Sequence, residues 1–292
     1  MPGCASFGPP SPEKAFAGRQ EPRRSAYAIS GDRKIATAES GDTNKPLVLF
    51  VHGSPGVWND FALVMADADL ARRALLVSVD RPGWGGSAEG GLEVSLPAQA
   101  RALKAVLDAH AQNLPAIVVG HSYGAPVAAR LAMDAPQHVG TLVIVAGSID
   151  PDLERTTWFQ AMGRWSGIRW MVPGMFKRAD AEIIPLKKEL EKMLPAWAGL
   201  RMSVTVIHGD SDALVPPENV DFALRALTNA SLVVKRIPKQ GHLIPWQRPG
   251  VIVDAIHAAL DEATAGPDAS RITNFPPGKQ TAHAHPTDGS AP

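Results

Sequence analysis

Short apolar runs that alternate with longer segments of helical pattern are the feature that most constrains the fold of this chain. The runs that we interpret as buried strands are Leu47–Val51, Ala74–Val79, Ala116–Val119, Thr141–Ala146, Val204–His208 and Leu232–Ile237. Strands that are apolar on both faces are typical of a parallel sheet, whose neighbouring strands need a crossover that is usually a helix. The sequence therefore predicts an α/β fold with a mostly parallel central sheet covered by helices on both faces.

The intervening segments carry their own signals. Leu96–His110 places its apolar residues on one stripe, as an amphipathic helix does. Pro126–Ala135 opens with a proline, which a helix tolerates in its first turn. Ahead of the first buried run, Tyr27–Ile29 and Lys34–Ala38 alternate well enough to form an antiparallel edge of the sheet, with Gly31-Asp32 as the turn between them.

One insertion interrupts the repeating pattern. We expect an α/β core over residues 26–147 and 200–264, and a helical cap over residues 148–199, which lack a strand pattern and are rich in Trp and Met. Large flexible apolar side chains suit a lid over an apolar pocket, although they could also serve only to pack the insertion against the core. Residues 1–25 and 265–292 are proline-rich and aperiodic, so we expect disordered tails there.

Charge and hydropathy exclude some classes of function. Lys plus Arg and Asp plus Glu both number 29, so the chain has no net field to attract nucleic acid or an anionic lipid surface. The longest apolar runs fall short of the roughly 18 residues that a membrane-spanning helix needs. We therefore expect no nucleic-acid partner and no membrane span.

The single cysteine, Cys4, bears on location. It has no second cysteine for a disulfide or a shared metal site. Only Pro2 and Gly3 separate Met1 from it, which leaves no apolar core for a cleavable signal peptide, so we expect a cytoplasmic protein. A Gly-Cys pair before a proline-rich tether also resembles the start of a mature bacterial lipoprotein, and Cys4 would be a lipid anchor if an upstream leader is missing.

The motif with the clearest chemistry is Gly120-His121-Ser122-Tyr123-Gly124. This G-x-S-x-G sequence follows the run Ala116–Val119 and opens the helix at Pro126, which is the context that such a turn requires. A serine on a sharp strand-to-helix turn is presented at the carboxyl end of the sheet, where the helix amino terminus favours developing negative charge. We expect Ser122 to be a nucleophile.

A serine nucleophile needs a general base and a carboxylate that orients the base. His242 follows the last apolar run in a loop that can return to Ser122, and the other histidines fit this role less well. Three aspartates are candidates for the acid. We favour Asp212 because it lies deeper in its loop, whereas Asp210 is better placed to cap that turn and Asp150 follows the preceding run.

The segment His52-Gly53-Ser54-Pro55-Gly56 follows the run Leu47–Val51, and its glycines allow the backbone to approach a reacting centre. The amides of Ser54 and Tyr123 would form a two-donor oxyanion hole, while Pro55 has no N–H to donate. The alternative interpretation is a Gly-Pro turn without a catalytic role. The residues that we expect to contact substrate are Trp58, Trp158, Met162, Trp165 and Leu243.

Taken together, these motifs resemble the α/β-hydrolase fold superfamily over residues 47–260. Asp80–Ser87 resembles its D-R-P-G-x-G-x-S turn, a mostly structural element. The resemblance implies a helical cap whose apolar inner face takes an acyl or aromatic substrate. Relatives that dehalogenate haloalkanes or open epoxides carry an aspartate at the elbow, so Ser122 argues against both reactions. Ser54 and Arg81-Pro82 depart from the H-G-G-P-G loop and the D-Q-R-G turn of proline iminopeptidases.

The sequence thus predicts a serine hydrolase without cofactor or metal, which cleaves a small or medium apolar carboxylic ester through an acyl-enzyme on Ser122. Alternatives that use the same site are carbon–carbon bond hydrolysis, perhydrolysis and acyl transfer. A hypothesis from another class is a non-catalytic ligand-binding protein on the same scaffold, although no member of its triad is missing. The oligomeric state stays open.

Overall fold

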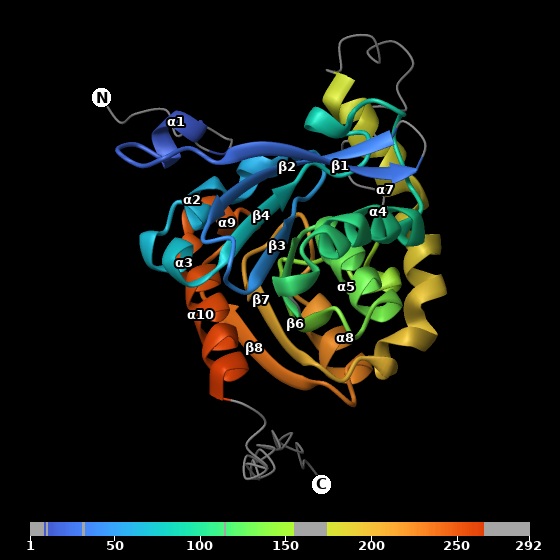
Figure 1. The fold of residues 1–292 in the computed structure, drawn as a ribbon. Coiled ribbons are helices and arrows are strands. Elements are labelled where there is room, and N and C mark those ends of the chain that lie inside the picture. The colour runs from blue at the N-terminus through green and yellow to red at the C-terminus, as the bar shows by residue number, and fades with distance from the viewer. Residues whose placement is uncertain (1–8, 10, 31–32, 114, 155–173, 266–292) are drawn as a thin grey trace, which may run out of the picture.

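The computed structural model describes residues 9, 11–30, 33–113, 115–154 and 174–265. Within these residues, eight strands form one sheet in the order β1-β2-β4-β3-β5-β6-β7-β8 (Figure 1). The strands are β1 Arg23–Ser30, β2 Arg33–Gly41, β3 Leu47–Val51, β4 Leu75–Val79, β5 Ala116–His121, β6 Val139–Val145, β7 Ser203–Gly209 and β8 Ser231–Ile237. The pairs β1–β2 and β2–β4 are antiparallel, and all the other pairs are parallel. The predicted mostly parallel sheet is confirmed.

Strand β3 shows why the central strands are continuous apolar runs. Leu47, Leu49 and Val51 enter the core on one face of the sheet, while Val48 and Phe50 enter the core on the other face. All five side chains are fully buried. A strand that is covered on both faces has no polar side, so its sequence cannot alternate. The bounds predicted for this strand are the same as those of β3.

Helices cover both faces of the sheet (Figure 1). On one face lie α4 Leu96–Ala109, α5 Gly124–Asp134 and α8 Asn219–Ala226, and on the other lie α2 Ala62–Met65, α3 Ala68–Arg73 and α10 Pro249–Ala265. The remaining helices are α1 Pro12–Ala15, α7 Gly174–Met193 and α9 Ile244–Gln247, together with the 3-10 turns η1 Trp58–Phe61, η2 Gly85–Ser87, η3 Ala111–Asn113, η4 Pro151–Leu153 and η5 Leu194–Gly199. Helix α5 begins two residues before Pro126, which leaves the proline in the first turn.

The amino-terminal segment differs from its prediction. The prediction of a disordered tail over residues 1–25 is wrong for the described residues of this segment, because α1 spans Pro12–Ala15 and β1 begins at Arg23. Phe16 is only 3% exposed and anchors this segment in the core that contains Phe50. One aromatic anchor in a polar, proline-rich stretch has no period, so no local pattern could reveal it. The rest of both predicted tails lies outside the described residues.

The described part of the insertion at 148–199 contains η4, α7 and η5. Leu186, Leu190 and Met193 of α7 are buried in the same core as α4 and α5. Residues 155–173 lie outside the described residues, and three of the predicted substrate contacts fall there: Trp158, Met162 and Trp165. None of the helices in the described ranges is long and apolar enough to cross a membrane.

Candidate active site

Ser122 occupies a sharp turn between β5 and α5 and is partly exposed. Its φ of 54° lies in the left-handed region that residues other than glycine rarely adopt. Two glycines permit this turn: a β-carbon on Gly120 would stand 2.6 Å from Ala125 Cα, and one on Gly124 would overlap the carbonyl oxygen of Val51. The crowding of strand against helix therefore maintains the strained backbone that presents the serine.

His242 and Asp212 are in direct contact. Nδ1 of His242 lies 2.8 Å from Oδ2 of Asp212, and both side chains are nearly or fully buried. The loops that carry them follow β8 and β7, two neighbouring parallel strands. The other carboxylate oxygen of Asp212 accepts hydrogen bonds from the amides of Leu214 and Val215, both at 2.9 Å. These two amides fix the carboxylate in the orientation that meets the imidazole.

The surroundings of Asp212 favour its ionised form. Burial alone would raise the pKa of this carboxyl, but hydrogen bonds from His208, from His242 and from the Val215 amide outweigh burial and leave the pKa below its usual range. Nε2 of His208 lies 3.4 Å from Oδ2 of Asp212 and also 3.1 Å from the carbonyl oxygen of Val215. Asp212 is thus a buried carboxylate that acts as an acceptor toward both histidines.

The two other candidate acids have different partners. Asp210 Oδ1 accepts from the amide of Lys239 at 2.6 Å and from the hydroxyl of Ser211 at 2.9 Å. Asp150 caps η4 by accepting from the amide of Asp152 at 2.9 Å. Within the described part of the chain, neither aspartate is hydrogen-bonded to His242. Of the three aspartates left open by the sequence, the structure brings Asp212 to the histidine.

His121 joins the histidine loop to the serine turn. Its Nε2–H donates to the carbonyl oxygen of His242 at 3.1 Å, and the two rings lie 4.8 Å apart between centroids. Burial, assisted by the neighbouring His242, lowers the pKa of His121 to about 3, so this imidazole is neutral at physiological pH. Because Ser122 follows His121 directly, the contact holds the His242 loop beside the serine.

The loop after β3 approaches the same point. A β-carbon on Gly53 would stand 3.0 Å from Cβ of Ser122, so the backbone at Gly53 and Ser54 passes next to the serine. Tyr123, the residue after the serine, occupies the N-cap position of α5 and is buried. The structure thus places Gly53, which precedes Ser54, against Ser122, and Tyr123 directly after it, while the role of the Ser54 and Tyr123 amides as oxyanion donors stays a prediction.

Two of the residues predicted to contact substrate, Trp58 and Leu243, lie in the described part of the chain. Trp58 is partly buried, with the guanidinium of Arg24 lying 4.9 Å from its ring centroid and its amide donating to Asp80 at 2.8 Å. Leu243 is also partly buried and directly follows His242 at the start of α9. A role for either in binding remains a prediction. Among the described residues, no group of three or more His, Cys, Asp or Glu is arranged to hold a metal ion.

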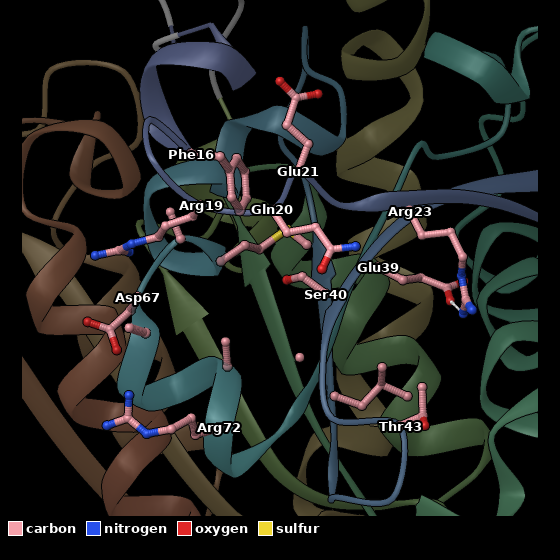
Figure 2. A pocket seen from close by; sticks show the side chains of 16 residues that line it. Phe16, Arg19, Gln20, Glu21, Arg23, Glu39, Ser40, Thr43, Asp67 and Arg72 are labelled. Carbon is pink, nitrogen blue, oxygen red and sulfur yellow. Dashed lines mark hydrogen bonds and ion pairs between the residues drawn. The ribbon is translucent and has the colours of Figure 1, made fainter.

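A separate pocket of about 540 Å³ lies between the amino-terminal segment, β2 and α3 (Figure 2). Leu75, the first residue of β4, lines it, which places the pocket at the amino ends of the parallel strands. Ser122 and Asp212 follow carboxyl ends, at the opposite edge. The pocket is lined by apolar residues that include Phe16 and Met65, and by three arginines and three acidic residues: Arg19, Arg23, Arg72, Glu21, Glu39 and Asp67.

The order of the strands defines an α/β protein with a mostly parallel sheet. The strained turn at Ser122 places a serine at the carboxyl edge of that sheet. A family model, that of the Alpha/beta hydrolase family, matches residues 48–255. The chain belongs to the α/β-hydrolase family, a family of hydrolase enzymes. This confirms the resemblance and the fold class expected from the motifs.

Solved structures share this fold. An esterase from Thermogutta terrifontis superposes with a TM-score of 0.62 at 18% identity, over 82% of this chain and 98% of that one. An epoxide hydrolase from Vigna radiata superposes with a TM-score of 0.61 at 17% identity, over 82% of this chain and 97% of that one. At such identities, the similarity establishes the fold alone.

Two of the curated relatives are plant proteins. A 1-acylglycerol-3-phosphate O-acyltransferase from Arabidopsis thaliana is 33% identical over 133 residues, which are 42% of this chain and 30% of that protein. A relative from Oryza sativa subsp. japonica is 31% identical over 136 residues, which are 44% of this chain and 32% of that protein. This chain therefore spans about a third of the length of the relatives that it matches.

Proposed function

We propose that this hydrolase cleaves a carboxylic ester through an acyl-enzyme on Ser122, with His242 as general base and Asp212 as the orienting acid. The observation that carries the proposal is the 2.8 Å contact between His242 and Asp212, located where His121 links the histidine loop to the serine turn. Three separate loops, after β5, β7 and β8, carry the serine, the aspartate and the histidine that acyl transfer through a serine requires.

The protonation states follow from the contacts. An ionised carboxylate can only accept, so the hydrogen of the His242 imidazole resides on Nδ1 and points to Asp212. This leaves the lone pair of Nε2 free to take the proton of the Ser122 hydroxyl. The serine oxygen then bonds to the carbonyl carbon, and the protonated imidazole returns the proton to the departing alkoxide. A water molecule, deprotonated by the same Nε2, then bonds to the acyl carbon. The bond from that carbon to the Ser122 oxygen breaks, the imidazole returns the proton to the serine oxygen, and the acid is released.

The developing oxyanion needs donors that are already in position. The amides of Ser54 and Tyr123 are the proposed donors, one from the loop after β3 and one from the start of α5. The amino terminus of α5 adds the positive end of its helix dipole at the same point. An apolar acyl group is the proposed substrate, because the tryptophans and methionines of the insertion suit a lid over an apolar pocket.

Acyl transfer is a second candidate, and the two plant relatives favour it because the Arabidopsis thaliana protein is named an O-acyltransferase. The same acyl-enzyme serves both reactions. The only difference is whether water or an alcohol attacks it, so the proposed roles of Ser122, His242 and Asp212 do not change.

The test is intact-mass measurement after treatment with a fluorophosphonate, on wild type and on Ser122→Ala, followed by turnover of p-nitrophenyl esters from acetate to laurate. We expect a single adduct that the variant lacks, and a loss of turnover that approaches the roughly 10⁶-fold known for triad removal. An adduct without ester turnover would favour carbon–carbon hydrolysis. The same assay with lysophosphatidic acid as acceptor distinguishes transfer, since acylated acceptor then replaces free acid. No adduct at all would favour a binding protein and refute the proposal.

A further inference from the structure

Arg81 is completely buried, and all five of its N–H groups are satisfied. Nε donates to the carbonyl oxygen of His52 at 2.9 Å, and Nη2 donates to the carbonyl oxygen of Gly53 at 2.8 Å. Nη1 donates to Oε1 of Gln99 at 2.8 Å. Nη1 and Nη2 each donate to one oxygen of Glu182, both at 3.0 Å, which makes a bidentate ion pair. A planar fork of this kind fixes its partners in direction as well as in distance.

One of these partners belongs to the proposed oxyanion hole. The carbonyl of Gly53 and the N–H of Ser54 are the two ends of the same peptide group, which is planar and places them on opposite sides. Arg81 and Nδ1–H of His52, at 2.7 Å, both donate to that carbonyl oxygen. Fixing the carbonyl therefore fixes the direction of the Ser54 N–H. A cationic donor on the carbonyl also polarises the peptide and strengthens its N–H as a donor.

His52 has the tautomer that donates to the same carbonyl oxygen of Gly53. Its Nε2 accepts the backbone N–H of Arg81 at 2.9 Å, so its hydrogen is on Nδ1 and available to Gly53. Burial, reinforced by the charge of Arg81, lowers the pKa of His52 well below its usual value and keeps the imidazole neutral.

Arg81 also contacts the second donor residue and the cap. Its guanidinium carbon lies 4.6 Å from the ring centroid of Tyr123, whose hydroxyl accepts from Gln99 at 3.2 Å. Its ion-pair partner Glu182 lies on α7, in the insertion, and accepts a further hydrogen bond from the indole of Trp84. Both carboxylate oxygens of Glu182 are thus engaged, and its side chain is fully buried. A side chain of the cap therefore holds the guanidinium that contacts both sides of the proposed hole.

We propose that Arg81 is the positioning residue of the oxyanion hole, and that Glu182 on the cap helix α7 holds it in place, so that the seating of the cap sets the geometry of the hole. This inference rests on the function proposed above. It assigns Arg81, within a turn that the sequence predicts to be mostly structural, a role in the stabilisation of the transition state. A buried ion pair is by itself weak evidence for a contribution to stability, so the expected effect is on rate.

The experiment compares Arg81→Lys and Glu182→Gln with the wild type. Lysine keeps the charge but cannot donate to Gly53 and Glu182 in the same fork. Glutamine keeps the shape of Glu182 and removes its charge. Glu189→Gln is the matched control, because Glu189 is also a buried carboxylate of α7, but it accepts from the amide of Leu96 at 3.0 Å rather than from Arg81.

For each protein, kcat and KM on the best p-nitrophenyl ester, the inhibition constant of a trifluoromethyl ketone analogue, and the midpoint of thermal unfolding are measured. Removal of a hole donor typically lowers kcat by roughly 10² to 10³. Because Arg81→Lys leaves the donor present but loosely held, we expect a fall in kcat of roughly 10- to 100-fold, with KM changed less than about threefold. The affinity for the ketone, whose adduct carries the oxyanion, should fall by the same factor as kcat.

Glu182→Gln should show the same pattern at a smaller size, roughly 3- to 10-fold, and Glu189→Gln should behave as the wild type. If Arg81→Lys and Glu182→Gln lower the unfolding midpoint while kcat and ketone affinity stay unchanged, the proposal is wrong and the pair is structural. If Arg81→Lys does not fold, the comparison of Glu182→Gln with Glu189→Gln decides alone. A wild type without a fluorophosphonate adduct would instead refute the proposed function, so the two failures are distinguishable.

Discussion

Replacement of Asp212 by asparagine tests the proposed triad most directly. Oδ1 of Asp212 accepts from the amides of Leu214 and Val215, and Oδ2 faces Nδ1 of His242 at 2.8 Å. The asparagine oxygen has to take the place of Oδ1, because both backbone partners are donors. Its NH₂ group then faces His242 and obliges Nδ1 to accept, so the imidazole hydrogen moves to Nε2.

An imidazole with its hydrogen on Nε2 cannot take the proton of Ser122. A wrong tautomer of this kind lowers kcat by about 10⁴ in a serine protease with the same three residue types. This factor corresponds to about 5.5 kcal/mol in the activation free energy, since each tenfold change is worth about 1.36 kcal/mol. We expect a loss of this order in Asp212→Asn, with KM little changed.

The measurement is kcat on a p-nitrophenyl ester, divided by the concentration of active sites from fluorophosphonate labelling. Asp210→Asn and Asp150→Asn are the controls, since Asp210 is hydrogen-bonded to Lys239 and Ser211, and Asp150 caps η4. Both controls should stay within a few-fold of the wild type. A larger loss in either control than in Asp212→Asn would show that the wrong aspartate has been assigned.

Three further predictions concern stability. Burial raises the pKa of Asp60 to about 7, so the folded state holds a proton that the unfolded chain releases near pH 4, and this group makes stability fall as the pH rises from about 4 to about 7. Asparagine does not titrate, so the free energy of unfolding of Asp60→Asn, measured in urea relative to that of the wild type, should increase by roughly 3 to 5 kcal/mol between pH 4 and pH 8. A difference between the two proteins that does not depend on pH would contradict the raised pKa. Gly124→Ala forces a methyl group against the carbonyl of Val51 and should lower the free energy of unfolding by roughly 1 to 3 kcal/mol, whereas Gly250→Ala, with open space around it, should not destabilise. Leu103→Ala should lower the free energy of unfolding by roughly 2 to 5 kcal/mol in the same assay, because Leu103 is fully buried. An equal decrease in the control Leu224→Ala, whose side chain is exposed, would rule out the packing argument.

Local signals in the sequence were sufficient for the sheet and for the serine turn. The apolar run Leu47–Val51 has the bounds of β3, since a strand covered on both faces must be apolar throughout. The G-x-S-x-G motif predicted a strand-to-helix turn, because only glycines fit where β5 and α5 crowd together. The sequence pattern of each feature lies within a few consecutive residues, so a single stretch of chain predicts it, although the carbonyl that crowds Gly124 belongs to the distant Val51.

The burial of Phe16 could not be predicted from local sequence signals. A proline-rich segment with one buried aromatic carries no period of a helix or a strand, and its burial depends on a core built from residues far along the chain. The same holds for the acid. Three aspartates follow strands at the appropriate edge, and the sequence favoured Asp212 only from its depth in the loop. The contact itself depends on the amides of Leu214 and Val215, which turn its carboxylate toward His242.

By itself, the sequence determined the α/β class, the order of the motifs and the identity of the candidate nucleophile and base, because short-range patterning and turn chemistry dictate them. Only the tertiary structure decided which side chains meet across long separations. Arg81 and Glu182 are 101 residues apart, and their ion pair exists because α7 packs against the loop after β4, where Arg178 also donates to the carbonyl oxygen of Gly83. Such pairing depends on how elements pack around a shared core, and the free energy of that packing belongs to the whole fold rather than to any segment of the chain.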